Sequence, residues 1–195
     1  ILLALRVRDK TGKGQHVDVS MLDGQISLLT FQAGIYFMTG KTPHRAGNQH
    51  PTICPYETFQ ASDGYLNVAV GNDKLFTAFA RLLGREDWTA DARFKSNPDR
   101  VKNRDALVAE IAPILGARKV SEWLEALEGA GIPAGPVFSI AEVLTHPQTL
   151  AREMVAELPH AKLGKVRVTG VPVKLSATPG RIQGPPPLHG EHTDA

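Results

Sequence analysis

Asp23 is the carboxylate whose position best suits nucleophilic chemistry. It follows residues 15–20, where valines alternate with polar side chains, and it precedes a long apolar run that ends before Gly40. The alternation predicts a strand, and the apolar run predicts a helix over residues 23–39. Asp23 would then stand where a strand ends and a helix begins, and the helix dipole stabilises an anion there. A carboxylate aimed out of a sheet edge can attack an electrophilic carbonyl.

The same position also suits a structural role. Aspartate is among the preferred helix N-caps, because its side chain accepts backbone N–H groups. A second carboxylate, Asp18, lies earlier on the predicted strand, on the same face as His16 and Ser20. We expect Asp18 to be structural, while Asp23 is either the nucleophile or a cap.

A second segment with ligand-binding chemistry runs from Arg45 to His50. Gly47 permits a ligand to approach the backbone closely. The side chains of Asn48, Gln49 and His50 carry hydrogen-bond donors, which suit a developing oxyanion. We expect these residues to bind substrate, and the alternative is an ordinary surface linker.

No metal is expected. His44, His50 and Cys54 carry zinc-binding atoms, but their spacing matches no standard ligand pattern. Cys54 is the single cysteine of the chain, which excludes an internal disulfide. A lone thiol fits a reducing compartment, and a cytoplasmic location is expected.

The composition is that of an ordinary globular protein. Of the 195 residues, 42% are hydrophobic and 22% are charged, and the net charge is +2. This charge is too small to indicate a nucleic-acid partner or an anionic membrane, although a slight basic excess would attract a phosphorylated ligand. Since no apolar run approaches the roughly 20 residues that span a bilayer, no membrane segment is expected.

The pattern of apolar residues and turn formers predicts the remaining elements. Residues 1–8 are predicted to be helical, and residues 40–55 form a long irregular segment. Two strands, 56–60 and 65–71, are joined by a hairpin turn. Helices are predicted at 72–83, over most of 86–130, at 139–144 and at 147–154, and a last hairpin at 155–158 and 165–168. The aromatic residues predicted to lie in the core are Phe76, Phe79, Trp88 and Trp123.

An ordered set of short segments resembles a known family. These are Gly12–Gly24, Arg45–Pro51, Pro55-Tyr56, Ala61–Gly64, Ala69–Asp73, Gly131–Val137 and Gly190–Thr193. Each segment alone is weak evidence, whereas their order along nearly the whole chain is specific. On these residues the chain resembles the family III CoA-transferases, the formyl-CoA transferase group.

The resemblance implies a reaction. CoA would pass from an acyl-CoA thioester to a free carboxylic acid through a covalent aspartyl intermediate, and Asp23 matches the catalytic aspartate. Residues 47–50 correspond to a glycine-rich loop that closes over the nucleophile in formyl-CoA transferase, although this sequence has a single glycine there. CoA enters as part of the substrate, and no other cofactor is implied.

The resemblance also implies an α/β fold with part of a large Rossmann-like domain and a small α+β domain. Residues 1–45 would end the large CoA-binding domain, 46–55 would be a linker, 56–155 the small domain and 156–195 a return segment. Family members fold as interlocked homodimers, so a second copy is the expected partner. The chain starts in mid-helix without Met, and we expect it to be truncated at this end. Family members carry a large nucleotide-binding segment before the corresponding point.

Two alternatives stay open. Related acyl-CoA racemases carry a longer segment of Glu-Pro-Gln type where this chain has Asn72-Asp73-Lys74, which favours a transferase. Asp73, or Asn72, is expected to cap the helix that follows. The second alternative is a non-catalytic fragment, because most CoA contacts in the family come from the segment that precedes this one.

Overall fold

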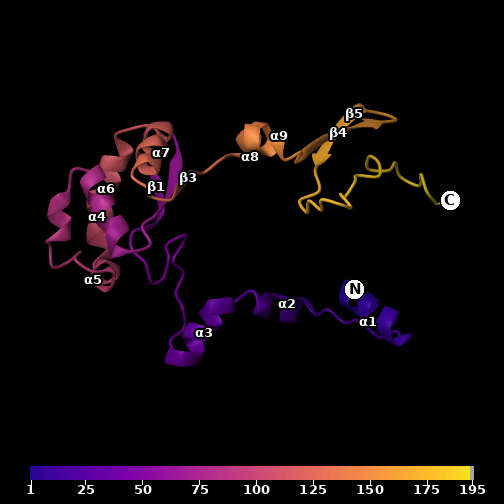
Figure 1. Ribbon diagram of the computed structural model, residues 1–195, viewed down its shortest axis with the longest axis horizontal. Coiled ribbons are helices and arrows are strands. Elements are labelled where there is room, and N and C mark those ends of the chain that lie inside the picture. Colours follow the sequence, from indigo (N-terminus) through magenta and orange to yellow (C-terminus); the bar gives the residue numbers. More distant parts are fainter. Residues whose placement is uncertain (194–195) are drawn as a thin grey trace. The chain divides into compact units, whose positions relative to one another are not determined.

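The computed structural model describes residues 1–193. They form two compact units, one from Ile1 to Gly47 and one beginning at Asn48, which are described separately. The helices and strands are labelled in Figure 1. Among the described residues, no helix is long and apolar enough to cross a membrane.

The first unit contains three short helices. These are α1 (Leu2–Thr11), α2 (Met21–Ser27) and α3 (Thr30–Thr39). None of their residues is buried, and the side chains of Met21, Phe37 and Met38 are 80–90% exposed. The helix predicted for residues 1–8 is confirmed as α1.

Two predictions for this unit are wrong. Residues 15–20 form no strand, because a strand needs a neighbour for its backbone hydrogen bonds and no described segment pairs with them. The helix predicted over residues 23–39 is two helices. The backbone N–H groups of Leu28 and Leu29 bond to carbonyls only three residues back, and Thr30 adopts a positive φ of 42°. That conformation is unfavourable for a β-branched residue and interrupts the helix.

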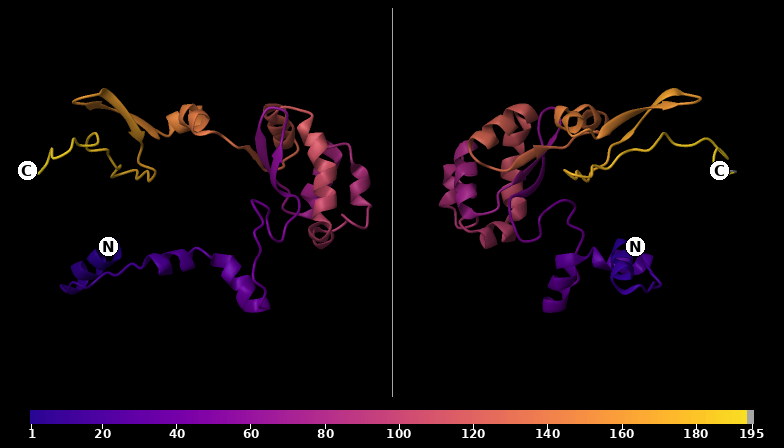
Figure 2. Two further views of the ribbon diagram at one scale, coloured as in Figure 1. Left: turned by 180° about the vertical axis from the view of Figure 1, so that it is seen from behind. Right: turned by 45° about the vertical axis from the view of Figure 1, so that its right-hand side comes forward.

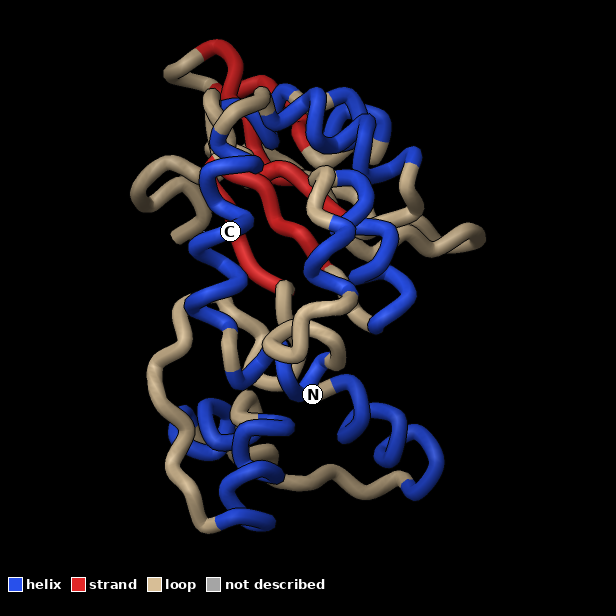
Figure 3. Tube along the Cα trace, turned by 90° about the vertical axis from the view of Figure 1, so that its left-hand side faces the viewer, coloured by secondary structure: helices blue, strands red, loops and turns tan. Residues whose placement is uncertain are grey.

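The second unit is built around a three-stranded antiparallel sheet. Its strands are β1 (Tyr56–Gln60), β2 (Tyr65–Ala69) and β3 (Ala134–Pro136), in the order β1-β2-β3. The predicted hairpin is confirmed, and its turn is closed by the Ala61 N–H donating to the Gly64 carbonyl at 2.8 Å. Residues 40–55, which precede β1, contain no helix or strand, as predicted (Figure 3).

Helices cover one face of this sheet (Figure 2). They are α4 (Asp73–Leu82), α5 (Asn97–Lys102), α6 (Arg104–Gly116) and α7 (Val120–Gly129), with a 3₁₀ turn η1 (Glu86–Thr89). Alternation along β1 sends Glu57 and Phe59 toward the helices and leaves Tyr56 and Gln60 exposed. The open face therefore carries polar side chains, and the covered face forms the core.

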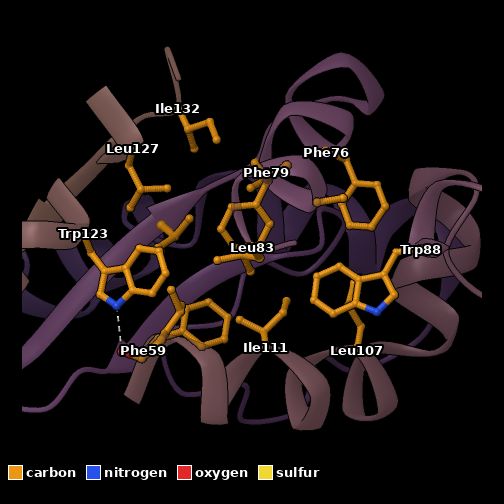
Figure 4. Close-up of a cluster of buried hydrophobic side chains, with 14 of the residues drawn as sticks. Phe59, Phe76, Phe79, Leu83, Trp88, Leu107, Ile111, Trp123, Leu127 and Ile132 are labelled. Atoms are coloured by element: carbon orange, nitrogen blue, oxygen red, sulfur yellow. Dashed lines mark hydrogen bonds between the residues drawn. The ribbon is translucent and has the colours of Figure 1, made fainter. Parts of the chain in front are cut away.

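The core confirms the aromatic residues that the helical spacing predicted. Phe76, Phe79, Trp88 and Trp123 are buried, and the leucine and isoleucine side chains of α6 and α7 fill the space between them (Figure 4). The Trp123 indole N–H donates to the Leu115 carbonyl at 2.8 Å, so this buried donor is satisfied.

The later elements were also predicted correctly. They are α8 (Ile140–Thr145), α9 (Pro147–Ala151) and a hairpin of β4 (Val155–His160) with β5 (Gly164–Thr169). Ser139 caps α8 through its side chain, and its partner Glu142 closes a capping box.

Glu110 on α6 joins α6 to η1. Its carboxylate accepts the Trp88 indole N–H at 2.8 Å and the Arg85 guanidinium at 2.7 Å, and Arg93 approaches at 3.3 Å. The indole hydrogen bond, aided by Arg85 and Arg93, lowers the pKa of Glu110 from its ordinary value near 4.5. A carboxylate with a depressed pKa stabilises the fold above its unfolded-state value, and that stabilisation is lost as pH falls through the folded-state value.

We therefore predict that Glu110→Gln lowers the free energy of unfolding at pH 7 by about 1 kcal/mol, the scale of charge-assisted hydrogen bonds at partly exposed sites. The difference from wild type should begin to shrink below pH ~4.5, where the unfolded-state carboxylate takes up a proton before the native one does. Urea unfolding followed by the fluorescence of Trp88 and Trp123 measures it. Glu125→Gln, at an exposed carboxylate on α7, is the matched control, and an equal loss at pH 7 and pH 3 would contradict the prediction.

Candidate active site

Asp23 lies in the first turn of α2. The N-cap of this helix is Ser20, whose hydroxyl oxygen accepts the Asp23 backbone N–H at 3.3 Å. The alternative that Asp23 caps the helix is therefore wrong, and the sequence had assigned the cap three residues too late. Within residues 1–193, the Asp23 carboxylate is exposed and takes part in no hydrogen bond or ion pair.

The described contacts therefore give the Asp23 carboxylate no structural task. It stands at the amino end of a helix, where the partial positive charge of the backbone favours an anion. Asp18, the other carboxylate of this segment, is also exposed and lies in the unpaired stretch before α2. Asp23 lies near a helix start, as predicted, although the helix begins at Met21 and no strand precedes it.

Gly47 has a left-handed conformation, with a φ of 61°. A Cβ atom built at this position would meet nothing within 4 Å. Glycine is therefore favoured here by backbone conformation, and open space surrounds it.

Asn48 is tied to the exposed face of β1. Its amide NH₂ donates to the Thr58 hydroxyl, and its carbonyl oxygen accepts the Thr58 backbone N–H at 3.4 Å. The Thr58 hydroxyl in turn donates to the Asn67 side-chain oxygen on β2. This chain of hydrogen bonds fixes the orientation of Asn48 and leaves it part of its donor capacity.

Gln49 is held by a buried ion pair. Its amide donates to the Glu57 carboxylate at 3.3 Å, and the other oxygen of Glu57 accepts the Arg104 guanidinium at 2.8 Å. The side chains of Arg104 and Glu57 are only 11% and 6% exposed. Sequence reasoning missed this pair, because 47 residues separate its members and neither stands in a recognisable motif.

His50 is fixed by its backbone and by its ring. Its N–H donates to the Tyr56 carbonyl at 3.0 Å, and its carbonyl accepts the Arg104 guanidinium at 2.6 Å. The imidazole stacks on the Tyr56 ring, with centroids 5.1 Å apart and planes 17° apart. Ring nitrogen Nδ1 accepts the Thr52 backbone N–H at 3.2 Å. Asn48, Gln49 and His50 are thus brought together at one edge of the sheet.

Within the described part of the chain, no group of three His, Cys, Asp or Glu side chains is placed to hold a metal ion. Cys54 is buried, and burial raises the pKa of its thiol from 9.0 to about 11, against the opposing effect of Arg104.

Asn72, and not Asp73, caps α4. The Asn72 side-chain oxygen accepts the Leu75 N–H at 2.9 Å. Asp73, at the first helical position, instead accepts the guanidinium of fully buried Arg100 at 2.6 Å. Asp73 therefore has a structural role, as expected, but in an ion pair and not as a cap.

Comparison with known proteins identifies the family. The model of CoA-transferase family III matches residues 1–193. The acetyl-CoA:oxalate CoA-transferase of Acetobacter aceti is 41% identical over 176 residues, which cover 90% of this chain and 44% of that protein. The human succinyl-CoA:glutarate CoA-transferase is 34% identical over 193 residues, with 99% and 44% covered. The chain therefore belongs to CoA-transferase family III.

A solved structure agrees. The crystal structure of a CaiB/BaiF family protein from Brucella suis matches with a TM-score of 0.83 at 37% sequence identity, over 98% of this chain and 49% of that one. This chain is thus a mixed α/β structure that matches about half of a family III structure. It likewise spans somewhat less than half the length of the curated relatives just named.

The state of Cys54 gives a prediction. At pH 8, a thiol with a pKa of about 11 holds about a hundredfold less thiolate than one at 9.0, and burial further blocks reagents. The native chain should therefore react with a disulfide reagent such as DTNB at least about a hundredfold more slowly than the urea-unfolded chain. Because Cys54 is the single cysteine, the absorbance change reports it alone. Rapid stoichiometric labelling of the native chain would contradict this placement.

Proposed function

We propose that this chain supplies the nucleophile and part of the substrate site of an enzyme that transfers CoA from an acyl-CoA to a free carboxylic acid. One observation carries the proposal. In a chain that belongs to CoA-transferase family III, the carboxylate of Asp23 is exposed at a helix start and has no structural partner among residues 1–193. A carboxylate in that condition is available for covalent catalysis.

The proposed mechanism uses Asp23 twice. Its carboxylate attacks the thioester carbonyl, and CoA leaves as the thiolate, which gives a mixed anhydride. The thiolate then attacks the aspartyl carbonyl, which releases the donor acid and leaves an aspartyl-CoA thioester. The acceptor carboxylate attacks this thioester and displaces the thiolate again, and the thiolate takes the acyl group from the second anhydride. The products are the new acyl-CoA and free Asp23, so atoms and charges balance.

Gly47, Asn48, Gln49 and His50 are proposed to bind substrate. Each tetrahedral intermediate carries an oxyanion, and preorganised donors stabilise such a charge. The hydrogen bonds of the Asn48 and Gln49 side chains to β1 and the stacking of the His50 ring on Tyr56 support the proposal, because they hold these side chains in defined orientations. CoA is the carrier within the substrate, and the proposal requires no metal or redox cofactor.

The substrate acids are proposed to be small dicarboxylates. The names of the two relatives specify oxalate for the Acetobacter aceti protein and glutarate for the human protein. Acetyl-CoA and succinyl-CoA are the corresponding donors named for them. Oxalate, succinate and glutarate are therefore the first acceptors to screen.

A domain arrangement accompanies the proposal. Residues 1–45 would belong to a large CoA-binding domain of Rossmann-like type, 46–55 to a linker, 56–155 to a small α+β domain and 156–195 to a return segment. A homodimer with interlocked chains is proposed from the family resemblance. The exposed apolar side chains of α2 and α3 support it, because surfaces of this kind are usually covered by a partner.

The nucleophile gives the first test. In the full-length protein, hydroxylamine or borohydride trapping during turnover with an acyl-CoA should modify Asp23, as read by peptide mass. Asp23→Asn should lower kcat by at least about 10³-fold, since covalent catalysis needs the ionised carboxylate. Asp18→Asn, a carboxylate-to-amide change five residues away, is the matched control and should change kcat less than about threefold. Trapping that persists in Asp23→Ala would sink the assignment.

The second test separates a transferase from a racemase. With a chiral 2-methylacyl-CoA in deuterated water, the full-length protein should move CoA to an acceptor acid and leave the α-carbon unexchanged, because transfer through Asp23 never breaks an α C–H bond. Racemisation requires proton exchange at that carbon. Mass spectrometry of the acyl-CoA measures the exchange. Deuterium uptake at turnover rates without CoA transfer would establish the racemase instead. The absence of both activities would favour a non-catalytic protein.

A further inference from the structure

We infer that Arg104 is a positioning residue that holds the His50 imidazole with its proton on Nε2, as a hydrogen-bond donor for an oxygen of the substrate. The inference deepens the proposed function and rests on it, because it assigns His50 a specific task in that reaction. Two sets of observations carry it: the linked contacts of Arg104 and Glu57, and the contacts of the His50 ring.

Arg104 fastens the backbone of the His50 segment. Nitrogen Nη2 donates to the His50 carbonyl at 2.6 Å and to the Ile53 carbonyl at 2.8 Å, while Nη1 donates to Glu57 at 2.8 Å. The planar guanidinium directs these hydrogen bonds from one rigid group, which an ammonium group would not do. Arg104 begins α6, so the segment is anchored to a helix whose other face lies in the core.

Glu57 compensates the positive charge of Arg104, whose side chain is almost removed from solvent. Its side chain is 6% exposed, and both of its oxygens are occupied, one by Arg104 and the other by Gln49. Ion pairs of this kind contribute little net stability compared with apolar residues, but they specify one arrangement. Here the specified arrangement is that of residues 49–53, which have no helix or strand to define them.

The His50 ring is held in one tautomer. Nδ1 accepts the Thr52 backbone N–H at 3.2 Å, so the neutral ring carries its proton on Nε2. Stacking on Tyr56 fixes the plane of the ring. Nε2 has no hydrogen-bond partner within residues 1–193, so its N–H is available to a ligand. A donor held in a fixed orientation stabilises an oxyanion.

The tautomer is tested without any activity measurement. In the full-length protein, two-bond ¹H–¹⁵N spectra of the imidazoles, assigned with His50→Ala, should show His50 with protonated Nε2 and unprotonated Nδ1 near pH 8. In the double variant Glu57→Gln/Arg104→Met, the His50 signals should move toward the tautomer average. This double variant removes both charges together, so it leaves no unpaired buried charge that would unfold the protein. Arg81→Met, at an exposed ion pair with Glu86 on the same domain, is the control and should leave the spectrum unchanged.

A kinetic cycle tests the coupling. His50→Ala should lower kcat by about 10²-fold, the range found when one oxyanion donor is lost, with KM for the acyl-CoA nearly unchanged. Glu57→Gln/Arg104→Met should lower kcat at least tenfold in the wild-type background but less than about twofold in His50→Ala. Residues that act through one another are non-additive in this way, whereas an independent structural defect would lower both backgrounds equally. His50→Gln, which retains a donor near Nε2, should recover part of the loss.

The outcomes are separable. A protonated Nδ1 in wild type, an unchanged tautomer in the double variant, or equal losses in both backgrounds would each overturn the inference. Wild type that transfers no CoA at all would instead refute the proposed function, and the spectra would still decide whether Arg104 sets the His50 tautomer.

Discussion

The segment from His50 to Cys54 depends on side chains for its backbone hydrogen bonds, and this constraint shapes the candidate substrate site. Its carbonyl groups point toward α5 and α6 and not toward a strand. Arg104 takes those of His50 and Ile53, Asn97 takes that of Thr52, and Arg100 takes that of Cys54. A buried carbonyl without a donor costs about as much as a lost hydrogen bond, so the loop cannot keep this path without these side chains. Arg100 is buried and Arg104 is nearly so, and each is balanced by one carboxylate.

The first unit differs from this segment, because no buried side chain holds its helices in place. Its helices are seven to ten residues long and bury none of their side chains within residues 1–47. Helices of that length are marginal in water without tertiary contacts. The Ser20 cap and the left-handed Gly12 and Gly40 mark where these helices begin and end, but they do not supply a core. The helices around Asp23 therefore require apolar contacts beyond those of this unit, which is consistent with the proposed interlocked dimer.

The sequence predicted local features well and tertiary ones poorly. Turn chemistry at residues 61–64, the Asn72 or Asp73 start of α4 and the spacing of the aromatic residues depend on neighbours in the chain, so the hairpin, the helix and the core followed from them. The strand predicted at 15–20 failed because alternation signals a strand only when a partner lies alongside. The sequence did not reveal the helix break at Thr30, because no glycine or proline marks it. The Arg104–Glu57 pair joins two elements 47 residues apart, and neither residue differs in type from many surface arginines and glutamates.

The proposed acyl transfer has two separate requirements. In the proposed reaction the nucleophile must be ionised and free of other partners, and the exposed carboxylate of Asp23 at a helix start would meet this requirement. A donor for the oxyanion must instead be fixed before the reaction, since reorienting a dipole during the reaction would cost part of the stabilisation that it supplies. A loop cannot fix a donor by secondary structure, so the orientation must come from elsewhere. In this chain the proposed donor would be fixed by the Arg104–Glu57 ion pair, which is anchored on a helix of the core. The free-energy cost of burying its two charges yields a defined geometry and not additional stability.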